Sequence, residues 1–308
     1  MATQKDVKNR ISSVKNIRKI TRAMEMVAAA RLRRAEQRIA AMRPFAQAIR
    51  RVTQRTAEAA GPAANRVALL QQRENVSKVG VILVTGDRGL AGSFNTQIIR
   101  AGMQLQRDIS SEGAEAVFYV VGRRGTSALS FRGEAIVDSF TGFTDQPVFA
   151  NAREIGDRLT AAYVDEEVDR VELIYNRYVS PLTQYVRRQT LLPLQEAEVY
   201  GEGIPEPEPV EDEELEEAHK RAEWIYEPEP EEALKLLFEE YVNLSVYRAL
   251  LESAASEHGA RMTAMRSAAE NAGDMIEALT LEMNRVRQAE ITQEILEVVG
   301  GAEALGSA

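Results

Sequence analysis

The residues with the clearest chemical potential are the glycines of Gly86–Gly92, GDRGLAG, which follow a short apolar stretch. Glycines after a strand let backbone N–H groups approach a phosphate at the start of a helix. The run fits neither common nucleotide-binding pattern, because Gly92 precedes Ser93 without a Lys and the glycines stand at 86, 89 and 92. A nucleotide site and a tight strand-to-helix turn both remain open. We favour the turn, with Asp87 and Arg88 pairing locally.

Other groups that could carry catalysis or bind a metal are few. The chain has 0 Cys and 2 His, which excludes thiolate chemistry and a His-rich metal site. His219 lies in an acidic stretch and His258 in a predicted helix, and both are better explained as exposed helix residues than as catalytic bases. The carboxylates of residues 202–217 form a solvated run, without the apolar pocket that would separate two pKa values. The sequence predicts no catalytic residue, no cofactor-binding residue and no metal site.

Short apolar stretches alternate with helical patterns in the middle of the chain. Predicted strands cover residues 78–85, 116–121, 135–140, 171–178 and 184–193. Helical patterns follow the glycine run and the GRRG run at 122–125, and a third covers residues 148–163. This alternation predicts a mostly parallel, open sheet covered by helices. The glycine run therefore lies where a strand meets a helix.

Two long helical patterns flank this α/β segment. Residues 2–60 contain no Gly and one Pro, and residues 231–299 contain no Pro and two Gly. Both exceed the usual helix length of about 8–20 residues. Apolar residues of the second stretch recur at alternating spacings of three and four, which predicts a heptad seam. They are Met262, Met265, Ala269, Ala272, Ile276, Leu279, Met283 and Val286.

The apolar stripe of the first long helix is less regular. Its register shifts between Val27 and Leu32, so we expect the seam to drift. Pro44 removes one backbone hydrogen bond and is expected to bend the helix. We expect the helix to end at Gly61 and Pro62. The stripe comprises Val7, Ile11, Val14, Ile17, Ile20, Met24, Val27, Leu32, Ala35, Ile39 and Met42.

Charge is distributed unevenly. Residues 1–55 contain fifteen Lys or Arg and three Asp or Glu, a local net charge of +12, whereas residues 196–240 carry −15 and the whole chain −9. A basic helix suits an acidic partner: nucleic acid, an anionic membrane or an acidic protein surface. Nucleic acid is disfavoured because residues 1–44 contain no aromatic side chain for stacking. A membrane surface is disfavoured because the apolar face is mostly Val, Ile, Met and Ala.

Two further segments bear on location and order. No run of about 18 apolar residues predicts a membrane span, and the N-terminus lacks the apolar core of a signal peptide. Residues 202–217, EGIPEPEPVEDEELEE, are acidic and Pro-rich. Such a composition buries too little apolar surface to order itself, so we expect this segment to be mobile.

Five motifs resemble the gamma subunit of bacterial F-type ATP synthases. They are ISSVKNIRKITRAMEMVAAARLRRA (11–35), TGDRGLAGSFN (85–95), YEPEP (226–230), ASEHGARMTAMRSAAENA (255–272) and NRVRQAEITQEILEVVGGAEAL (284–305). The likeness covers nearly the whole chain in the family's order. It implies an antiparallel coiled coil of the N- and C-terminal helices and a central Rossmann-like open sheet. The implied parts are a shaft helix (1–60), an α/β foot domain (76–195), an acidic loop with the foot contact (196–230) and a second shaft helix (231–300).

The resemblance also implies a function. It predicts a non-catalytic rotor inside a ring of three catalytic and three non-catalytic nucleotide-binding subunits, which couples proton flow to ATP synthesis and hydrolysis. It implies contacts with an epsilon subunit and with the proton-carrying c-ring, and a peripheral place on the cytoplasmic face of the bacterial plasma membrane. It implies no cofactor and no nucleic acid.

Site residues follow from the matching motifs. The resemblance implies that the catalytic hexamer contacts Met24, Arg261, Arg287, Gln288 and Thr292. It implies that the c-ring contacts Trp224, Tyr226 and Glu227. The chain departs from the family in its longer acidic segment at 202–217. Acidic regulation and a tolerated surface insertion both remain open, and we favour the tolerated insertion. Without Cys, a thiol switch in this region is impossible.

Overall fold

The computed structural model of the chain describes residues 4–61, 64, 67–194 and 229–306, with side chains described as far as residue 299. The chain divides into two compact units: a helical unit of residues 1–30 and 261–308, and an α/β unit of residues 31–260. Two long helices, α1 (Gln4–Ala60) and α7 (Pro230–Gly306), contribute to both units.

The α/β unit is built on a five-stranded sheet in the order β3-β2-β1-β4-β5. Its strands are β1 (Lys78–Val84), β2 (Glu115–Val121), β3 (Ile136–Phe140), β4 (Arg170–Tyr178) and β5 (Gln184–Leu192). The first four run parallel, and β5 pairs antiparallel with β4. Continuous apolar runs such as KVGVILV in β1 suit a strand covered on both faces. The predicted mostly parallel, open sheet is confirmed.

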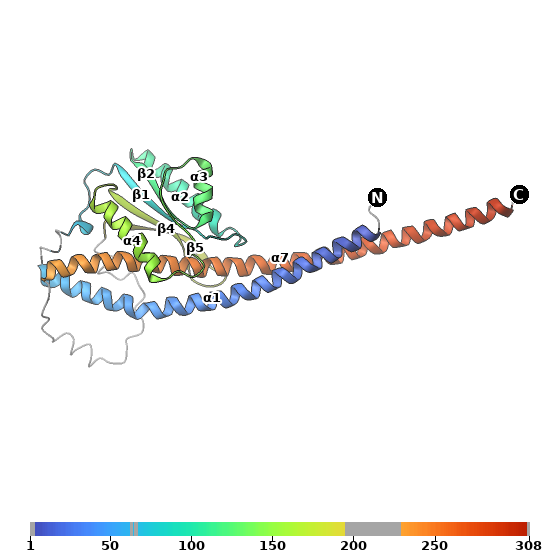
Figure 1. Cartoon of the computed structure of the whole chain (residues 1–308), viewed down its shortest axis with the longest axis horizontal. Helices are drawn as coiled ribbons and strands as arrows, with labels where there is room; N and C mark the ends of the chain where they lie inside the picture. The colour runs from blue at the N-terminus through green and yellow to red at the C-terminus, as the bar shows by residue number, and fades with distance from the viewer. Residues whose placement is uncertain (1–3, 62–63, 65–66, 195–228, 307–308) are drawn as a thin grey trace. The chain divides into compact units, whose positions relative to one another are not determined.

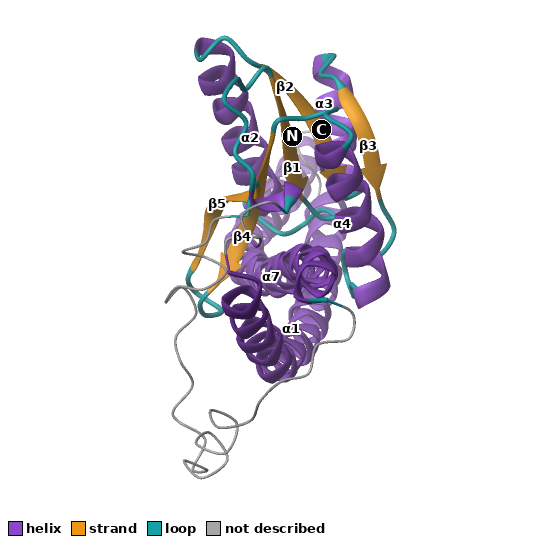
Figure 2. Cartoon of the chain, turned by 90° about the vertical axis from the view of Figure 1, so that its left-hand side faces the viewer, coloured by secondary structure: helices purple, strands orange, loops and turns teal. Residues whose placement is uncertain are grey.

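Helices cover both faces of this sheet, as Figure 2 shows for α2 and α4. Leu105 of α2 packs with Phe118 of β2 on one face. Leu159 of α4 and Phe238 of α7 share the core on the other face with Tyr119, and Figure 1 shows this part of α7 beside the sheet. The remaining elements are η2 (Ala68–Leu70), α2 (Phe94–Ser111), α3 (Arg123–Arg132) and α4 (Phe149–Val164).

The ends of the long helices follow from local chemistry. Helix α7 begins with Pro230, at the position where a missing N–H costs no helical hydrogen bond. Glu231 and Glu232 follow in its first turn, where the helix dipole favours negative charge. Helix α1 ends at Ala60 and Gly61 has φ +57°, the left-handed conformation that ends many helices. Pro44 lies inside α1, and the bend expected there stays a prediction.

In the helical unit, α1 and α7 pair in opposite directions. The backbone N–H of Gln4 donates to Glu290 Oε1 over 3.3 Å. Further along α1, Glu25 Oε1 accepts from Arg266 Nε over 2.8 Å. Residue numbers rise along one helix while they fall along the other, so the antiparallel coiled coil implied by the resemblance is present in this unit.

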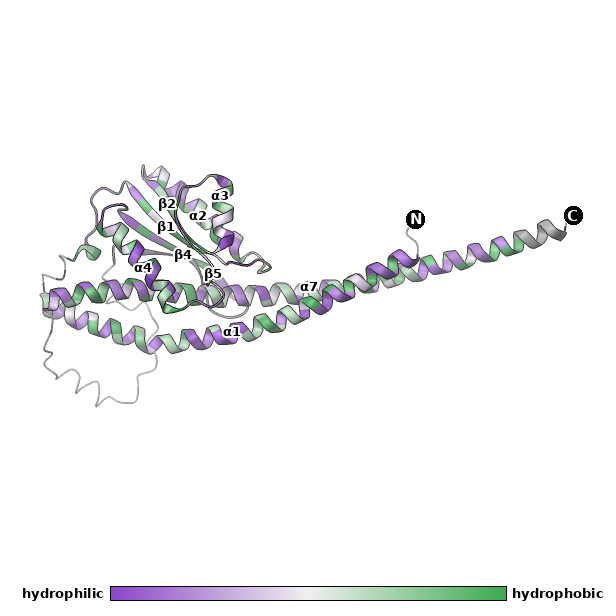
Figure 3. Cartoon of the chain, viewed as in Figure 1, coloured by the Kyte–Doolittle hydropathy of each residue, from purple (hydrophilic) through white to green (hydrophobic). Residues whose placement is uncertain are grey.

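The predicted heptad seam of α7 is confirmed. Every member of the pattern from Met262 to Val286 is buried or half-buried. Leu279 packs with Val7 and Ile11 of α1 in one buried cluster. Figure 3 shows hydrophobic and hydrophilic residues in alternating bands along both long helices, the pattern expected when each buries one face.

The seam of α1 differs from the predicted stripe. Ile17, Ile20 and Val27 are 52%, 59% and 54% exposed, whereas Ala28 is 1% exposed. Among the buried and half-buried positions, which also include Met24, Ala29, Arg31 and Glu36, one row keeps alternating spacings of four and three. The shift of register predicted between Val27 and Leu32 is therefore wrong. Three of these positions hold polar residues, which explains why an apolar pattern misses them. The positions are Val7, Ile11, Val14, Arg18, Thr21, Glu25, Ala28, Leu32, Ala35, Ile39 and Met42.

Candidate functional site

The carboxyl ends of β1 and β4 mark the place where an open α/β sheet usually binds a ligand. The chain moves from β1 outward to β2 and β3 and then returns to place β4 on the other side of β1. Ligands of such sheets bind in the crevice beyond the carboxyl ends of the strands at this switch point. The glycine run that follows β1 lies at the same edge.

Helix α7 fills this crevice with a buried polar face. Ser253 Oγ donates to the carbonyl oxygen of Val84, at the end of β1, over 3.3 Å. Ser256 Oγ donates to a backbone carbonyl of β4 over 3.1 Å. Glu257 is 2% exposed, and its carboxylate lies so close to Gly86 that an added Cβ would be 2.8 Å from it. The position of a ligand is therefore taken by the chain itself.

The carboxylate of Asp87 satisfies the backbone donors that could otherwise hold an anion. Its Oδ2 accepts from the N–H of Gly142 over 2.8 Å and from the N–H and hydroxyl of Thr144 over 3.2 and 3.0 Å. Its Oδ1 accepts from the N–H of Arg123 over 3.1 Å. This internal carboxylate takes the part that a phosphate plays in a nucleotide-binding loop.

The glycine run forms a tight turn, but its predicted ion pair is wrong. Arg88 Nη1 lies 3.9 Å from Asp145 Oδ2, because the oxygens of Asp87 already accept backbone hydrogen bonds from neighbouring loops. Gly122, at the start of the GRRG run, has φ +93°, and a Cβ there would lie 2.3 Å from the carbonyl oxygen of Thr85. Glycine is required at residue 122 for close packing of the two loops.

Two buried titratable side chains, Tyr175 and His258, lie near the crevice. Burial, followed by the carboxylate of Glu252, raises the pKa of Tyr175 to about 12, so this phenol keeps its proton at neutral pH. His258, predicted to be exposed, is 1% exposed. That prediction is wrong because the loop after β3 covers α7 here, and His258 Nε2 donates to the carbonyl oxygen of Asp145 over 3.2 Å.

A polar stretch interrupts the seam of the helical unit. The guanidinium of Arg18 lies over Gly273, where an added Cβ would meet Arg18 Cζ at 3.5 Å. The hydrogen bond with Glu25 raises the pKa of Arg266. Small residues on α7 thus leave room for long polar side chains on α1. The stretch borders an open cavity of about 220 Å³, lined by Arg18, Arg22, Glu25, Arg266, Ala269 and Glu270.

The end of α7 carries exposed apolar side chains. They follow the residue of α7 that contacts Gln4, the first described residue of α1. Glu290 contacts Gln4, and the apolar residues that follow are 44% to 72% exposed. Exposed large apolar groups gathered in one short segment are typical of a surface that meets another protein or a membrane. These residues are Ile291, Ile295, Leu296, Val298 and Val299.

The residues assigned to the hexamer contact are spread along the two long helices. Met24 is half-buried on α1. Arg261 is 8% exposed, so most of its side chain is already covered within the chain. Arg287, Gln288 and Thr292 are exposed on successive turns of α7, and Thr292 Oγ1 donates to the carbonyl oxygen of Gln288 over 2.9 Å. Their contacts with another subunit stay a prediction.

The predicted c-ring contacts Trp224, Tyr226 and Glu227 lie outside the described residues, as do His219 and the acidic segment 202–217. Within the described part of the chain, no group of three or more His, Asp or Glu side chains stands ready to hold a metal ion. None of the helices in the described ranges combines the length and the apolar character needed to cross a bilayer.

Comparison with known proteins gives matches along the whole chain. A family model described as ATP synthase matches residues 3–305. The ATP synthase gamma chain of Rubrobacter xylanophilus is 41% identical over 308 residues, covering 100% of both chains. The ATP synthase gamma chain of Moorella thermoacetica is 42% identical over 305 residues, covering 99% of this chain and 100% of the relative.

Solved structures share the fold. A structure of the central stalk and c-ring of the mitochondrial ATP synthase of Tetrahymena thermophila matches with a TM-score of 0.55 and 28% identity, covering 81% of this chain and 99% of that chain. A chain from the mitochondrial ATP synthase of Euglena gracilis matches with a TM-score of 0.65, covering 99% of this chain and 95% of that chain. The second match is 18% identical and concerns the fold alone.

Proposed function

The chain belongs to the ATP synthase gamma-chain family, and from this premise we propose that it turns as the non-catalytic rotor of an F-type ATP synthase. Its role is that of the gamma subunit, the central stalk of the enzyme complex. The observation that carries this conclusion is identity of about 40% to gamma chains over their full length. The antiparallel pairing of α1 with α7 adds the physical requirement of a stalk, because two paired helices resist bending better than one.

The absence of catalysis by the chain itself is part of this proposal. It is supported by the closed crevice, where Ser253 and Glu257 of α7 stand in the place of a ligand. It is also supported by Asp87, which takes up the backbone donors around the glycine run. A nucleotide at this edge would have to displace both groups, so ATP chemistry belongs to the neighbouring subunits.

We place the hexamer contacts along the helical surfaces. The proposed partners are three catalytic and three non-catalytic subunits around α1 and α7, and an epsilon subunit beside the stalk. The basic charge of residues 1–55, +12, favours acidic loops on the surrounding ring. Exposed ion pairs contribute only about 0–1 kcal/mol each, so the shape of the stalk should dominate torque and charge should modulate it. The contacting residues are Met24, Arg261, Arg287, Gln288 and Thr292.

The membrane contact is proposed from the same family assignment. The c-ring would bind the segment that precedes α7, through Trp224, Tyr226 and Glu227. The stalk is peripheral to the membrane part of the complex. We propose that it lies on the cytoplasmic face of a bacterial plasma membrane and couples proton flow to ATP synthesis.

Reconstitution tests the function directly. The full chain is mixed with purified catalytic and non-catalytic subunits, and ATP hydrolysis is measured with and without it. We expect a stable complex whose hydrolysis depends on the chain, while the chain alone shows no hydrolysis and no heat of ATP binding. Saturable hydrolysis by the isolated chain would contradict the non-catalytic role. Failure to join the hexamer would contradict the rotor assignment.

A further inference from the structure

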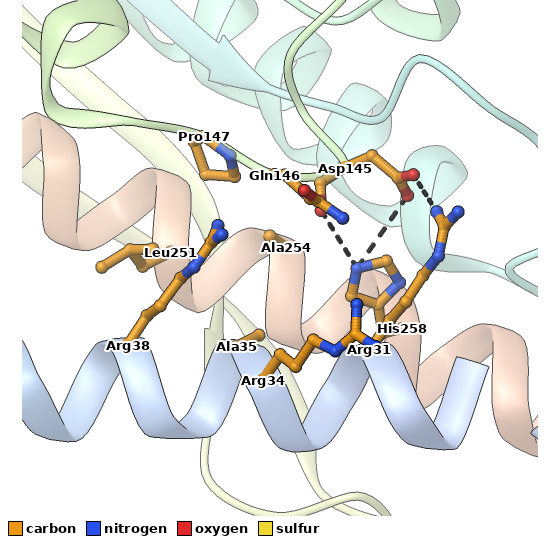
Figure 4. A pocket seen from close by; sticks show the side chains of 10 residues that line it. All are labelled: Arg31, Arg34, Ala35, Arg38, Asp145, Gln146, Pro147, Leu251, Ala254 and His258. Atoms are coloured by element: carbon orange, nitrogen blue, oxygen red, sulfur yellow. Dashed lines mark hydrogen bonds and ion pairs between the residues drawn. The ribbon is translucent and has the colours of Figure 1, made fainter. Parts of the chain in front are cut away.

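An ion pair and a hydrogen bond join the middle of α1 to the rest of the α/β unit. Arg31 forms the ion pair with the carboxylate of Asp145, on the loop before α4. Further along α1, Glu36 Oε1 accepts from the phenol of Tyr178, at the end of β4, over 2.5 Å. Figure 4 shows Arg31 reaching from α1 toward the loop that carries Asp145. We call these two contacts the α1 latch.

The two contacts of the α1 latch lie on either side of the buried seam of α1. With 3.6 residues per turn, Arg31 and Glu36 point about 140° apart around the helix axis. Leu32 and Ala35, which are 4% and 8% exposed, lie within this arc. Met42, further along the same seam, packs with residues of α7. The α1 latch therefore holds α1 on both sides of the line along which it packs on α7.

The order of the strands explains how the latch reaches both sides. Asp145 follows β3 and Tyr178 ends β4, and these strands lie on opposite sides of β1 in the sheet. Helix α7 meets the carboxyl end of β1, where Ser253 Oγ donates to the carbonyl oxygen of Val84. The two anchors, Asp145 and Tyr178, are thus placed on the two sides of α7.

Both anchors are held in place. His258 is 1% exposed, and its Nε2 donates to the carbonyl oxygen of Asp145 over 3.2 Å, which ties the loop before α4 to α7. Burial, followed by the hydrogen bond to Glu36, raises the pKa of Tyr178. The phenol therefore keeps its proton at neutral pH and stays a donor to Glu36.

The two long helices are fixed to the α/β unit in different ways. Residues 251–259 of α7 are all buried, whereas α1 alternates buried and exposed positions over residues 31–43. A helix that is buried all round cannot rotate about its axis without disrupting close packing. A helix that packs along one seam can rotate more easily, unless contacts on both sides of the seam oppose it.

We propose that the α1 latch prevents α1 from rotating about its own axis against α7, so that both long helices turn together with the sheet. The proposal rests on the rotor function proposed above. Torque between the sheet and the helices passes to α7 through its buried contacts and to α1 through Arg31 and Glu36. Two helices that share the twist make a stiffer stalk than α7 alone. The latch residues are positioning residues for this transmission.

The torsional stiffness of the assembled stalk tests the proposal. A hexamer containing the full chain is immobilised without ATP, and a bead is attached through Ser130→Cys, at an exposed position of α3 in a chain with 0 Cys. The angular fluctuation of the bead reports the stiffness. Arg31→Ala with Tyr178→Phe removes both contacts, and the mean-square fluctuation should rise toward about twice that of the unmodified chain, the limit in which α7 carries the twist alone.

The single substitutions test whether the two sides act together. Arg31→Ala or Tyr178→Phe alone leaves one side of the α1 latch in place. The rise in the double variant should therefore exceed the sum of the rises in the single variants. An unchanged fluctuation in the double variant, or a rise no larger than that sum, would overturn the proposal.

Matched variants separate the α1 latch from a general effect of the substitutions. Arg33→Ala with Tyr185→Phe makes the same changes at exposed positions of α1 and β5 and should leave the fluctuation unchanged. Arg31→Lys with Tyr178→Phe keeps the charge opposite Asp145 and should behave as Tyr178→Phe alone. A control pair that loosens the stalk as much as the latch pair would contradict the assignment.

A measurement on the isolated chain keeps the latch apart from the rotor function. Spin labels at Gln37→Cys and Ser130→Cys, both exposed within the α/β unit, report the distribution of distances between α1 and α3. Loss of both latch contacts should broaden this distribution, and an unchanged distribution would refute the latch. Failure of the unmodified chain to join the hexamer would instead contradict the rotor function.

Discussion

The carboxylate of Glu257 lies directly against Gly86, so that a Cβ added at residue 86 would stand 2.8 Å from it. Glu257 is 2% exposed and has little room to move away. This contact joins the glycine run after β1 to the helix that fills the crevice. The glycine therefore serves the approach of a helix, where in a nucleotide-binding sheet it would serve the approach of a phosphate.

Replacing Gly86 should weaken this junction. Gly86→Ala forces the methyl group against a buried carboxylate, and we expect a loss of about 1–3 kcal/mol in the free energy of unfolding. Urea denaturation of the full chain measures it. Gly273→Ala is the matched control, because its Cβ meets Arg18 only at 3.5 Å and alanine is favoured in a helix by about 1 kcal/mol. Equal stability of the Gly86→Ala variant and the unmodified chain would refute the close contact.

The sequence predicts the α7 seam throughout but misses the α1 seam at Ile17, Ile20 and Val27, for one physical reason. On α7 the buried positions are apolar, so spacing alone finds them. On α1 the buried face holds Arg18 and Thr21, while apolar Ile17 and Ile20 are exposed. An apolar stripe marks a buried face only when the residues opposite require apolar neighbours. Here Gly273 and other small residues of α7 accept polar ones.

The candidate site could likewise be predicted from the sequence only in part. The order of strands and the tight turn at the glycine run follow from composition and spacing. The closure of the crevice does not, because it depends on Ser253 and Glu257, which are distant from the glycine run in sequence. Polar residues in the middle of a long helix usually indicate an exposed face. Only the tertiary structure shows that these are buried against the ends of β1 and β4.

A pair of lysine substitutions tests the corrected seam of α1. Ala28 is 1% exposed and Val27 is 54% exposed, whereas the apolar stripe places Val27 inside. Ala28→Lys should cost about 2–4 kcal/mol in the free energy of unfolding, since it buries a charge. Val27→Lys should stay within about 0.5 kcal/mol of the unmodified chain. Chemical denaturation measures the free energy of unfolding of both variants. A larger loss for Val27→Lys than for Ala28→Lys would contradict the corrected seam and support the predicted shift of register.

Asp169 should make stability depend on pH in the acid range. Burial raises the pKa of this carboxyl, but hydrogen bonds to its Oδ2 from the N–H of Lys78 and from the N–H and hydroxyl of Ser77 outweigh it, and the net pKa is lowered. A lowered pKa in the folded state stabilises above the unfolded value of about 3.9. That stabilisation is lost as the pH falls through the folded pKa.

The corresponding substitution is Asp169→Asn. We expect Asp169→Asn to lower the free energy of unfolding by about 1–2 kcal/mol at neutral pH. This value is at the lower end for hydrogen bonds to a charged group, because the site is partly exposed. The difference from the unmodified chain should shrink below about pH 4. Denaturation curves at several pH values measure this. Asp165→Asn changes an exposed carboxyl on the same loop and serves as the control. A difference that persists at low pH would contradict the linkage.

The exposed apolar end of α7 should contribute to the hexamer contact without contributing to the stability of the chain. Ile295, Leu296 and Val298 are 57%, 66% and 72% exposed. Replacing all three by Gln keeps good helix formers and should change unfolding by less than about 1 kcal/mol in total. If a partner buries these side chains, each substitution removes about 1.5–3 kcal/mol of burial energy, so binding to the catalytic hexamer should weaken by at least about a hundredfold.

Replacing Glu290, Glu294 and Glu297 by Gln alters the same segment at exposed charged positions and should weaken binding to the hexamer much less. Dissociation rates of the two triple variants from immobilised hexamer provide the comparison, and equal rates would exclude an apolar contact at this end of the helix.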